Sequence, residues 1–181
     1  ANLLARAGWK PGQTWGYEVT LPAGFDYAEA EGPRHPWRYW AQRGVSLARG
    51  GAPNAAEALE EGVILLPQGA RGPAFLALPN HYVIRRYNNS VSYALGVALL
   101  ARQIDGGGPV AAPWPRDIEP LSRAQLQALQ EALNRKGCAA GTPDGVMGPA
   151  TRAGLRGYQR SLGVVADGYP TLELLQKLQA P

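Results

Sequence analysis

The seven residues from Tyr87 to Tyr93 bring two phenol rings, side-chain amides and hydroxyls together. An aromatic ring can stack on a cyclic ligand, and an amide can donate and accept hydrogen bonds, so Tyr87, Asn88 and Tyr93 are candidate binding residues. From the spacing alone, ordinary structural roles are favoured. Both tyrosines would then be core aromatics, and Asn88 or Asn89 would cap the helix that follows.

The nine glutamates are the main candidates for acid–base chemistry. A catalytic acid needs an apolar cleft that raises its pKa, and a two-carboxylate hydrolase needs a second acid facing it. Nothing in their placement favours such a pair. Glu18 is expected on a strand, Glu29 and Glu31 beside a loop, Glu57, Glu60 and Glu61 on a solvated helix face, and Glu119, Glu131 and Glu173 in or near the C-terminal part of the chain.

The sequence offers few residues for disulfide formation or metal binding. Cys138 is the only cysteine, which excludes an intrachain disulfide, and neither His35 nor His81 lies at metal-ligand spacing. No metal or other cofactor is therefore expected. The formal charge of +4 comes from scattered arginines, which argues against a nucleic-acid partner but suits an anionic polymer.

The N-terminus is unusual. Residues 1–9 open directly in a helical pattern, without a methionine or a capping segment, which indicates the tail of a helix whose beginning is missing. We expect a mature or cut fragment. No apolar window is long enough to span a bilayer and no signal pattern is present, so the chain as given is expected to be soluble, with membrane contact only through an upstream anchor.

The elements that position the Tyr87–Tyr93 segment are predicted to form a small antiparallel sheet with helices. Residues 91–104 are apolar nearly all round, so a helix there must be buried. A hairpin loop is expected over residues 68–73. Strand patterns are found at residues 17–21, 62–67, 74–78 and 82–87, and short helical patterns at residues 36–43 and 54–59.

Two Asp-Gly loops divide the last sixty residues into three helical patterns. In each loop, the aspartate is expected to accept hydrogen bonds from its own loop amides, and the glycine to supply a positive φ. Turn residues usually serve the turn, so a structural role is favoured over ligand contact. The residues assigned this role are Asp144, Gly145, Gly148, Asp167 and Gly168.

The three helices have clear boundaries and apolar faces. Ser122 and Gln125 fit a capping box, and the second helix is expected to begin at Gly148-Pro149. Gly154 and Gly157 lie inside that helix, where close approach of another backbone would explain them. The residues expected to be buried are Leu126, Leu129 and Leu133, then Leu155, Tyr158 and Leu162, then Leu172, Leu175 and Leu178.

Residues 105–121 separate this module from the rest of the chain. Their glycine triplet and several prolines predict a semi-rigid spacer. The alternative is an ordered loop that packs on its neighbour through Trp114. The predicted domains are therefore residues 1–104, a Gly/Pro-rich linker over residues 105–121, and residues 122–181.

Residues 122–179 resemble the three-helix peptidoglycan-binding module that many bacterial cell-wall enzymes carry at one terminus. About a dozen positions agree in order and spacing. They are Leu126-Gln127, Leu133, Gly137, Gly141, Asp144-Gly145, Gly148, Thr151, Leu155, Tyr158-Gln159, Gly163, Asp167-Gly168 and Leu175. If ligand binds here, we expect it in a groove near Arg152, Tyr158 and Gln159.

The first hundred residues resemble the C-terminal half of the B-type lytic murein transglycosylases. The resemblance implies an α+β fold, namely part of a lysozyme-like core with a small antiparallel β subdomain, followed by the three-helix domain. It also implies glycan-cleft binding by Tyr87, Asn88 and Tyr93, with Ser90 capping the helix. The matching motifs are Trp15 to Val19, Trp40 with Gly44-Val45, Leu66 to Gly69, Gly72 to Leu76 and Arg86 to Ala94.

These enzymes cleave between N-acetylmuramic acid and N-acetylglucosamine, leaving a 1,6-anhydro product, by means of one glutamate in a Glu-Ser-x-x-Gly-like context. No glutamate here has that context. The resemblance therefore implies peptidoglycan glycan and stem peptide as partners, a missing N-terminal catalytic half, no catalytic residue in this chain, and the bacterial periplasm or cell envelope as location. The alternative is a noncatalytic cell-wall-binding protein on a degenerate transglycosylase scaffold.

Overall fold

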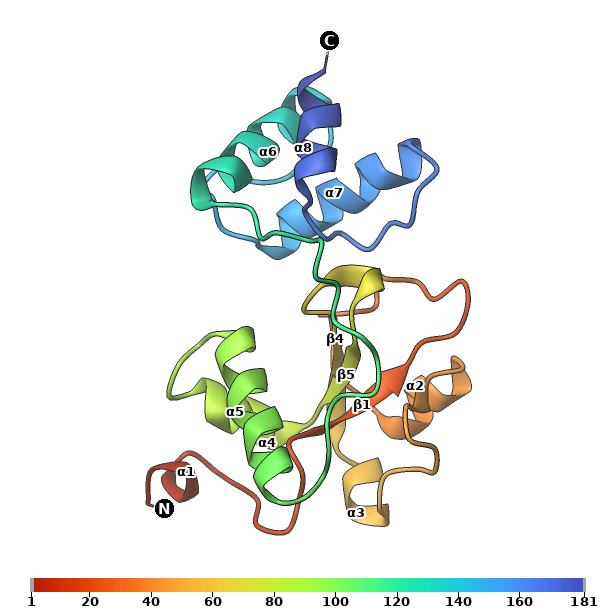
Figure 1. Ribbon diagram of the computed structural model, residues 1–181, viewed down its shortest axis with the longest axis vertical. Coiled ribbons are helices and arrows are strands. Elements are labelled where there is room, and N and C mark those ends of the chain that lie inside the picture. The colour runs from red at the N-terminus through yellow and green to blue at the C-terminus, as the bar shows by residue number, and fades with distance from the viewer. Residues whose placement is uncertain (1, 181) are drawn as a thin grey trace. The chain divides into compact units, whose positions relative to one another are not determined.

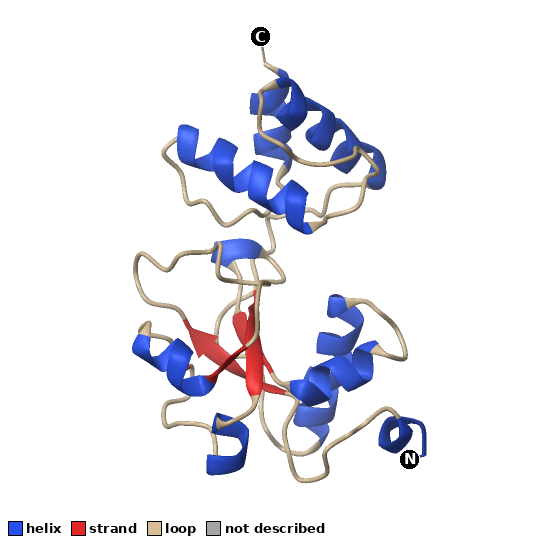
Figure 2. Ribbon diagram, turned by 180° about the vertical axis from the view of Figure 1, so that it is seen from behind, coloured by secondary structure: helices blue, strands red, loops and turns tan. Residues whose placement is uncertain are grey.

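The computed structural model describes residues 2–180 and divides into two compact units. The first unit comprises the chain up to Pro67 together with Gly72–Trp114. The second comprises Gln68–Arg71 and the chain from Pro115 onward. The α+β fold class predicted from the sequence is confirmed, because the first unit mixes a sheet with helices and the second is helical (Figures 1 and 2).

A twisted antiparallel sheet of order β2-β4-β5-β1-β3 lies at the centre of the first unit (Figure 2). The predicted strands at residues 17–21, 62–67 and 74–78 are confirmed, and β4 and β5 form the expected hairpin pair. Two strands of two residues each were not predicted. The strands are β1 (Gly16–Thr20), β2 (His35–Pro36), β3 (Ser46–Leu47), β4 (Glu61–Leu65) and β5 (Ala74–Ala77).

Helices cover both faces of this sheet, so its central strands are apolar on both sides (Figure 1). On one face, Ile64 and Leu76 pack against the fully buried Trp40 of α2. On the other, Phe75 packs in a cluster with Ala94 and Leu95 of α5. The helices of this unit are α1 (Asn2–Arg6), α2 (Trp37–Gln42), α3 (Ala55–Ala58), α4 (Pro79–Arg85) and α5 (Val91–Ile104).

The predicted strand at residues 82–87 is wrong, because α4 covers most of this segment. Pro79 occupies the first turn of the helix, where its fixed φ favours helical backbone and its missing N–H costs nothing. Val83 and Ile84 are both buried, which a helix permits for adjacent residues but an alternating strand does not. The apparent alternation of residues 82–87 was therefore coincidental.

The prediction that α5 is buried all round is also wrong. Ala94, Leu95 and Ala98 are buried, whereas Leu100 is 58% exposed and Ile104 80% exposed. One face of α5 packs on α4 and the sheet, and no described residue covers the opposite apolar face.

Residues 106–114, expected to form part of a spacer, pack on the first unit. The backbone N–H groups of Ala111 and Ala112 donate to the Glu18 carboxylate, and the Trp114 ring lies 6.1 Å from that of Phe75. This agrees with the alternative interpretation of an ordered loop held through Trp114. We call residues 106–114 the strap.

The second unit packs three helices around one leucine-rich core, with the short 3₁₀ turn η1 (Gly69–Arg71) beside them. The capping box is confirmed, since Ser122 and Gln125 exchange both expected hydrogen bonds. The helices are α6 (Arg123–Arg135), α7 (Pro149–Ser161) and α8 (Leu172–Gln179).

Several predictions about the helix faces need correction. Leu162 and Leu172 lie at helix ends and are 39% and 45% exposed, while Leu174, two residues further into α8, is buried instead. Gly154 is explained as expected, because a Cβ there would lie 3.1 Å from the carbonyl oxygens of Cys138 and Ala139. Gly157 is not, since a Cβ there would meet no atom within 4 Å.

Candidate functional site

The junction between α4 and α5 presents two aromatic rings to solvent. Tyr87 is 68% exposed and Tyr93 is 38% exposed, and their ring centroids lie 6.0 Å apart at an interplanar angle of 32°. These values are incompatible with core aromatics, the role that spacing alone favoured. Such an exposed, tilted ring pair at the α4–α5 junction can contact a cyclic ligand without much loss of side-chain entropy, since each tyrosine has only two side-chain torsions.

The backbone around these rings is fixed by local hydrogen bonds. Ser90 caps α5, as expected, because its Oγ accepts from the Tyr93 backbone N–H at 3.2 Å. The Asn89 side chain accepts from Arg85 at 2.8 Å. The exposed Asn88 amide has no hydrogen-bond partner among residues 2–180, so its donor and acceptor remain available for a ligand.

Two glutamates of the first unit are buried, and both fasten backbone. Glu18 on β1 is 6% exposed, and its two oxygens accept from the Ala112 and Ala111 backbone N–H groups at 2.7 and 2.8 Å. Buried carboxylates held in this way are committed to structure, because their oxygens are occupied by backbone N–H donors.

Glu57 was expected on a solvated helix face, and this expectation is wrong, because the residue is only 3% exposed. Asn54 caps α3 and accepts from the Glu57 backbone N–H, which turns the glutamate side chain inward. There it accepts from the Thr14 backbone N–H at 2.7 Å and from the Tyr17 hydroxyl. Burial and the adjacent carboxylate raise the pKa of Tyr17, so this hydroxyl stays a donor.

His81 is the other buried titratable group of this unit. It is fully buried beside Trp15, and neither ring nitrogen has a hydrogen-bond partner within the described chain. Burial, with the Arg85 charge adding to it, lowers the pKa of His81 to about 4, so the ring is neutral at pH 7. Among residues 2–180, no three His, Cys, Asp or Glu side chains come together as a metal site would require.

In the second unit, each Asp-Gly loop is clamped by a buried glutamine. Gln159 donates to Asp167 Oδ1 at 2.7 Å and accepts from the Gly168 N–H at 2.8 Å. Gln130 does the same with Asp144 Oδ1 at 3.1 Å and Gly145 N–H at 2.9 Å. The structural role expected for these aspartates and glycines agrees with this geometry.

The residues expected to line a groove in this unit are mainly interior. Tyr158 and Gln159 are 8% and 3% exposed, and the Gln159 amide is committed to its loop, whereas Arg152 is partly exposed. Gln130 was missed altogether. The sequence did hold a signal for it, because Arg123 to Leu133 and Arg152 to Leu162 share the pattern Arg-Ala-x-Leu-x-x-Leu/Tyr-Gln-x-x-Leu.

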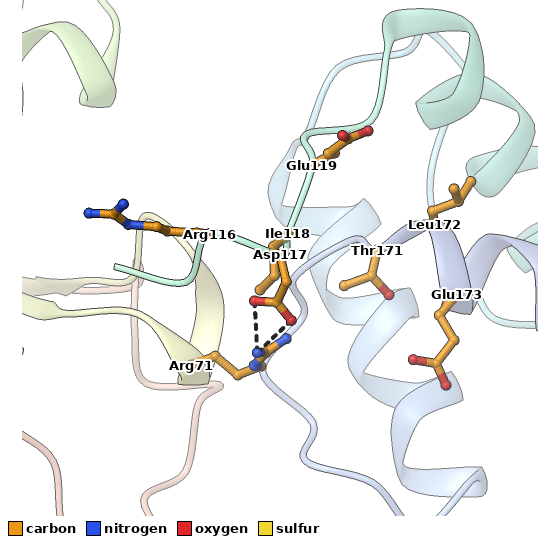
Figure 3. Close-up of a pocket in the computed structure, with 8 residues that line it drawn as sticks. All are labelled: Arg71, Arg116, Asp117, Ile118, Glu119, Thr171, Leu172 and Glu173. Carbon is orange, nitrogen blue, oxygen red and sulfur yellow. Dashed lines mark hydrogen bonds and ion pairs between the residues drawn. The ribbon is translucent and has the colours of Figure 1, made fainter. Parts of the chain in front are cut away.

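A cavity of about 390 Å³ lies within the second unit, between residues 71 and 116–119 and the start of α8 (Figure 3). Arg71 donates to both oxygens of Asp117, at 3.0 and 2.8 Å, and this lowers the pKa of the Asp117 carboxyl. Figure 3 shows Arg116 pointing away from that pair. The charges lining the cavity are thus paired or divergent, and they do not converge on one ligand group.

Two family models match the sequence. The model described as "Transglycosylase SLT domain" matches residues 1–102, and the one described as "Putative peptidoglycan binding domain" matches residues 122–178. A comparison with curated proteins gave no match.

Two solved structures resemble nearly the whole chain. SltB3 from Pseudomonas aeruginosa in complex with NAG-anhNAM-pentapeptide is 46% identical, with a TM-score of 0.94 over 99% of this chain and 48% of its own. The same protein in complex with NAG-NAM-pentapeptide is 47% identical, with a TM-score of 0.93 over 98% of this chain and 48% of its own. The chain therefore spans about half the length of this relative.

Proposed function

The chain belongs to the transglycosylase SLT-domain family, and from that premise we propose that it supplies glycan binding and cell-wall attachment to a lytic transglycosylase. The parent enzyme would cleave between N-acetylmuramic acid and N-acetylglucosamine and leave a 1,6-anhydro product. The chain would form the C-terminal half of a B-type enzyme, acting in the periplasm or cell envelope, where peptidoglycan lies. No described helix is long and apolar enough to cross a membrane.

The observation that carries this proposal is the exposed pair of Tyr87 and Tyr93 beside the unbonded Asn88 amide. Tyrosine rings suit the apolar face of a sugar, and an amide suits the N-acetyl group that both murein sugars carry. Because the three residues stand where a capped helix begins, the fold holds them in place before a ligand arrives.

In the reaction we propose, one carboxylic acid gives its proton to the glycosidic oxygen as the bond from that oxygen to C1 breaks. The resulting carboxylate takes the proton of the muramic C6 hydroxyl, whose oxygen forms the new bond to C1. We assign this acid to a part of the enzyme other than the described residues. Both glutamates buried here, Glu18 and Glu57, are committed to backbone hydrogen bonds instead.

The proposed domains are residues 1–104 and 122–181, with residues 105–121 between them. The limits of the two family matches, 1–102 and 122–178, support these boundaries. Within the second domain we retain a ligand groove near Arg152, in which Tyr158 and Gln159 shape the floor from inside rather than touch the ligand.

The binding surface is tested by changing Tyr87 to alanine in the full chain. Stacking of one ring contributes about 1 kcal/mol, so affinity for isolated murein sacculi should fall about fivefold, measured by co-sedimentation. Leu100→Ala is a matched control, because Leu100 is similarly exposed on the same unit, on α5. Equal losses in both variants, or no loss in Tyr87→Ala, would remove Tyr87 from the binding surface.

A further inference from the structure

The second unit contains an internal repeat with a structural meaning. In each copy an arginine near the start of a helix precedes the clamping glutamine by seven positions, and an Asp-Gly loop follows. We call residues 123–147 the first copy and residues 152–170 the second. The corresponding pairs are Arg123 with Arg152, Leu126 with Leu155, Leu129 with Tyr158, Gln130 with Gln159, Asp144 with Asp167 and Gly145 with Gly168.

The two loops have the same backbone geometry. Gly145 has a φ of 71° and Gly168 a φ of 70°. A Cβ on either glycine would meet the carbonyl oxygen of the arginine in its own copy, at 2.6 and 3.0 Å. In each loop, Oδ1 of the aspartate accepts from the N–H two residues later, at 2.8 Å for Asp144 and 2.9 Å for Asp167. The copies are therefore equivalent in hydrogen bonding as well as in sequence.

The copies differ in the hydrogen-bond partner of the other aspartate oxygen, Oδ2. Asp167 Oδ2 accepts from the backbone N–H of Ala70 at 2.9 Å, and Ala70 belongs to η1 in the same unit. The preceding Gly69 has a φ of 63° and lies against Tyr169, the residue after the Asp-Gly pair. The second copy thus holds a peptide segment made of a residue with positive φ followed by an N–H donor.

The first copy presents the same groups to solvent. Asp144 is exposed, and its Oδ2 has no hydrogen-bond partner among residues 2–180. Hydrogen bonds from Val146 and then Gln130 lower the pKa of Asp144, so the carboxylate is charged at neutral pH. Val146, the counterpart of Tyr169, is 55% exposed. The groups that hold a peptide in the second copy are therefore accessible in the first.

The second copy also defines which peptide fits. At Gly69, the Cβ of an L-residue would lie 2.4 Å from Asp167 Oδ2 and 2.6 Å from the Cβ of Tyr169. A D-residue prefers positive φ, since its allowed backbone regions mirror those of an L-residue, and its Cβ replaces the other hydrogen on Cα. An L-residue would therefore clash in such a loop, whereas glycine fits and a D-residue would direct its Cβ away from these two contacts.

We propose that the Asp144-Gly145-Val146 loop binds the peptidoglycan stem peptide at a D-residue and accepts the N–H that follows this residue on Asp144 Oδ2. This inference rests on the proposed function, because stem peptides are the D-residue-containing peptides of the cell wall. It assigns the stem peptide, and not the glycan, to this loop. The glycan remains with Tyr87 and Asn88.

The test uses the complete chain labelled with nitrogen-15 and the synthetic peptide L-Ala-γ-D-Glu-L-Lys-D-Ala-D-Ala with an amidated C-terminus, which keeps a second carboxylate away from Asp144. Titration should shift the amide signals of Gly145 and Val146. The same peptide with L-residues in place of all three D-residues should bind at least about tenfold more weakly. Equal binding of the two peptides, or shifts confined to other regions, would overturn the proposal.

Asp144→Asn is the matching variant, since it keeps the shape and Oδ1 of the side chain but replaces the Oδ2 acceptor with a donor. Affinity for the D-peptide should fall about tenfold, as expected for loss of a hydrogen bond to a charged acceptor. Asp105→Asn, with the same charge change in an exposed position of the first unit, should bind like the parent chain. Unchanged binding in Asp144→Asn would also contradict the proposal.

Murein sacculi separate this inference from the proposed function. If the chain sediments with sacculi but ignores the D-peptide, the loop assignment is wrong and the proposed function stands. If the chain fails to sediment with sacculi at all, the proposed function is wrong, and the loop assignment that rests on it is withdrawn too.

Discussion

Buried carboxylates fasten loops in the first unit, whereas buried amides fasten the Asp-Gly loops of the second. Glu18 and Glu57 accept backbone N–H groups that lie 93, 94 and 43 positions away in sequence. Gln130 and Gln159 hold glycine N–H groups only 15 and 9 positions away. These two carboxylates therefore make long-range contacts, whereas the two glutamines act locally. The division is not complete, because the buried Asn80 amide of the first unit bonds the distant Lys10 and Gln13, and Asp167 of the second accepts from Ala70, 97 positions away.

The two units also differ in the surfaces that they offer to ligands. The first unit places aromatic rings outside, on a helix start, while its buried charges hold the strap and the N-terminal loop. The second keeps Tyr158 inside and presents Asp144 and Val146 outside, on a loop fixed by Gln130. The surface of the first unit would thus suit the sugar rings of a glycan, as proposed for Tyr87 and Tyr93. The surface of the second would suit the backbone N–H groups of a stem peptide, as proposed for Asp144.

The largest loss of unfolding free energy is expected from Gly145→Ala, which tests the local clamp of the second unit. The substitution forces an L-residue to a φ of 71° and brings its Cβ to 2.6 Å from the Arg123 carbonyl oxygen. We expect a loss of about 3–5 kcal/mol of unfolding free energy. In hydrogen exchange, only the second unit should lose protection, since the Gln130 clamp is local.

Gly137→Ala is the matched control for this variant. Gly137 has a similar φ of 77°, but a Cβ there would meet no atom within 4 Å. Its cost should therefore be only the backbone strain of about 1 kcal/mol. Equal losses for the two variants would show that backbone conformation, and not the close approach to Arg123, limits the first loop.

Glu18→Ala tests whether a buried carboxylate holds the strap of the first unit. It removes the acceptor of two strap N–H groups and should cost about 3 kcal/mol, since bonds to charged acceptors contribute about 1.5–3 kcal/mol each. Hydrogen exchange should increase over residues 106–114 while α6–α8 keep their protection. Glu61→Ala, at an exposed position of the neighbouring hairpin, should leave the strap protected. A strap that stays protected in Glu18→Ala would show that its other contacts hold it, namely Trp114 packing and the hydrogen bonds from Arg49 and Arg102.

The third effect depends on pH and arises from His81, and it is absent at neutral pH. Its pKa of about 4 in the folded chain lies below the ordinary value of 6.5, so the unfolded chain binds the proton more readily between these values. Stability from this group is fully present above pH 6.5 and is lost as the pH falls toward 4. Scaled by about 1.4 kcal/mol per pKa unit, the loss is about 3.5 kcal/mol at most.

His81→Phe isolates this contribution. Neither ring nitrogen of His81 has a hydrogen-bond partner in the described chain, so an apolar ring of similar size should be tolerated at pH 7. Urea unfolding of the first unit, followed by the fluorescence of Trp15 and Trp40, should then vary less between pH 6.5 and pH 4 than in the parent chain. An unchanged pH dependence would assign the acid sensitivity to other groups.

The sequence predicted the second unit better than the first, for the same physical reason that separates their loops. Capping residues, leucine spacing and Asp-Gly turns are local signals, and the elements they specify use contacts close in sequence. Glu57 was misassigned to a solvated face because its partners, Thr14 and Tyr17, are distant in sequence. The strands β2 and β3, of two residues each, carry no periodic signal.

The residues of the candidate sites were also predicted with unequal success. The family motif singled out Tyr87, Asn88 and Tyr93 as binding residues. The exposure of Tyr87 was not predicted because segment 82–87 was assigned to a strand, and that of Tyr93 because the helix over residues 91–104 was expected to be buried. Gln130 and the repeat that contains it were present in the sequence but are visible only when two segments with different loop lengths are aligned. Helix spacing predicted the burial of Tyr158 correctly, whereas the burial of Gln159 comes with its bonds to the Asp167-Gly168 loop, which helix spacing alone does not resolve.

We propose that this chain binds peptidoglycan but does not cleave it by itself. Incubating the purified chain with murein sacculi, then separating pellet from supernatant and analysing the soluble fragments by mass spectrometry, tests both halves together. We expect the chain in the pellet and no 1,6-anhydro fragments in the supernatant. Release of such fragments by the chain alone, lost on changing one of its glutamates, would contradict the account.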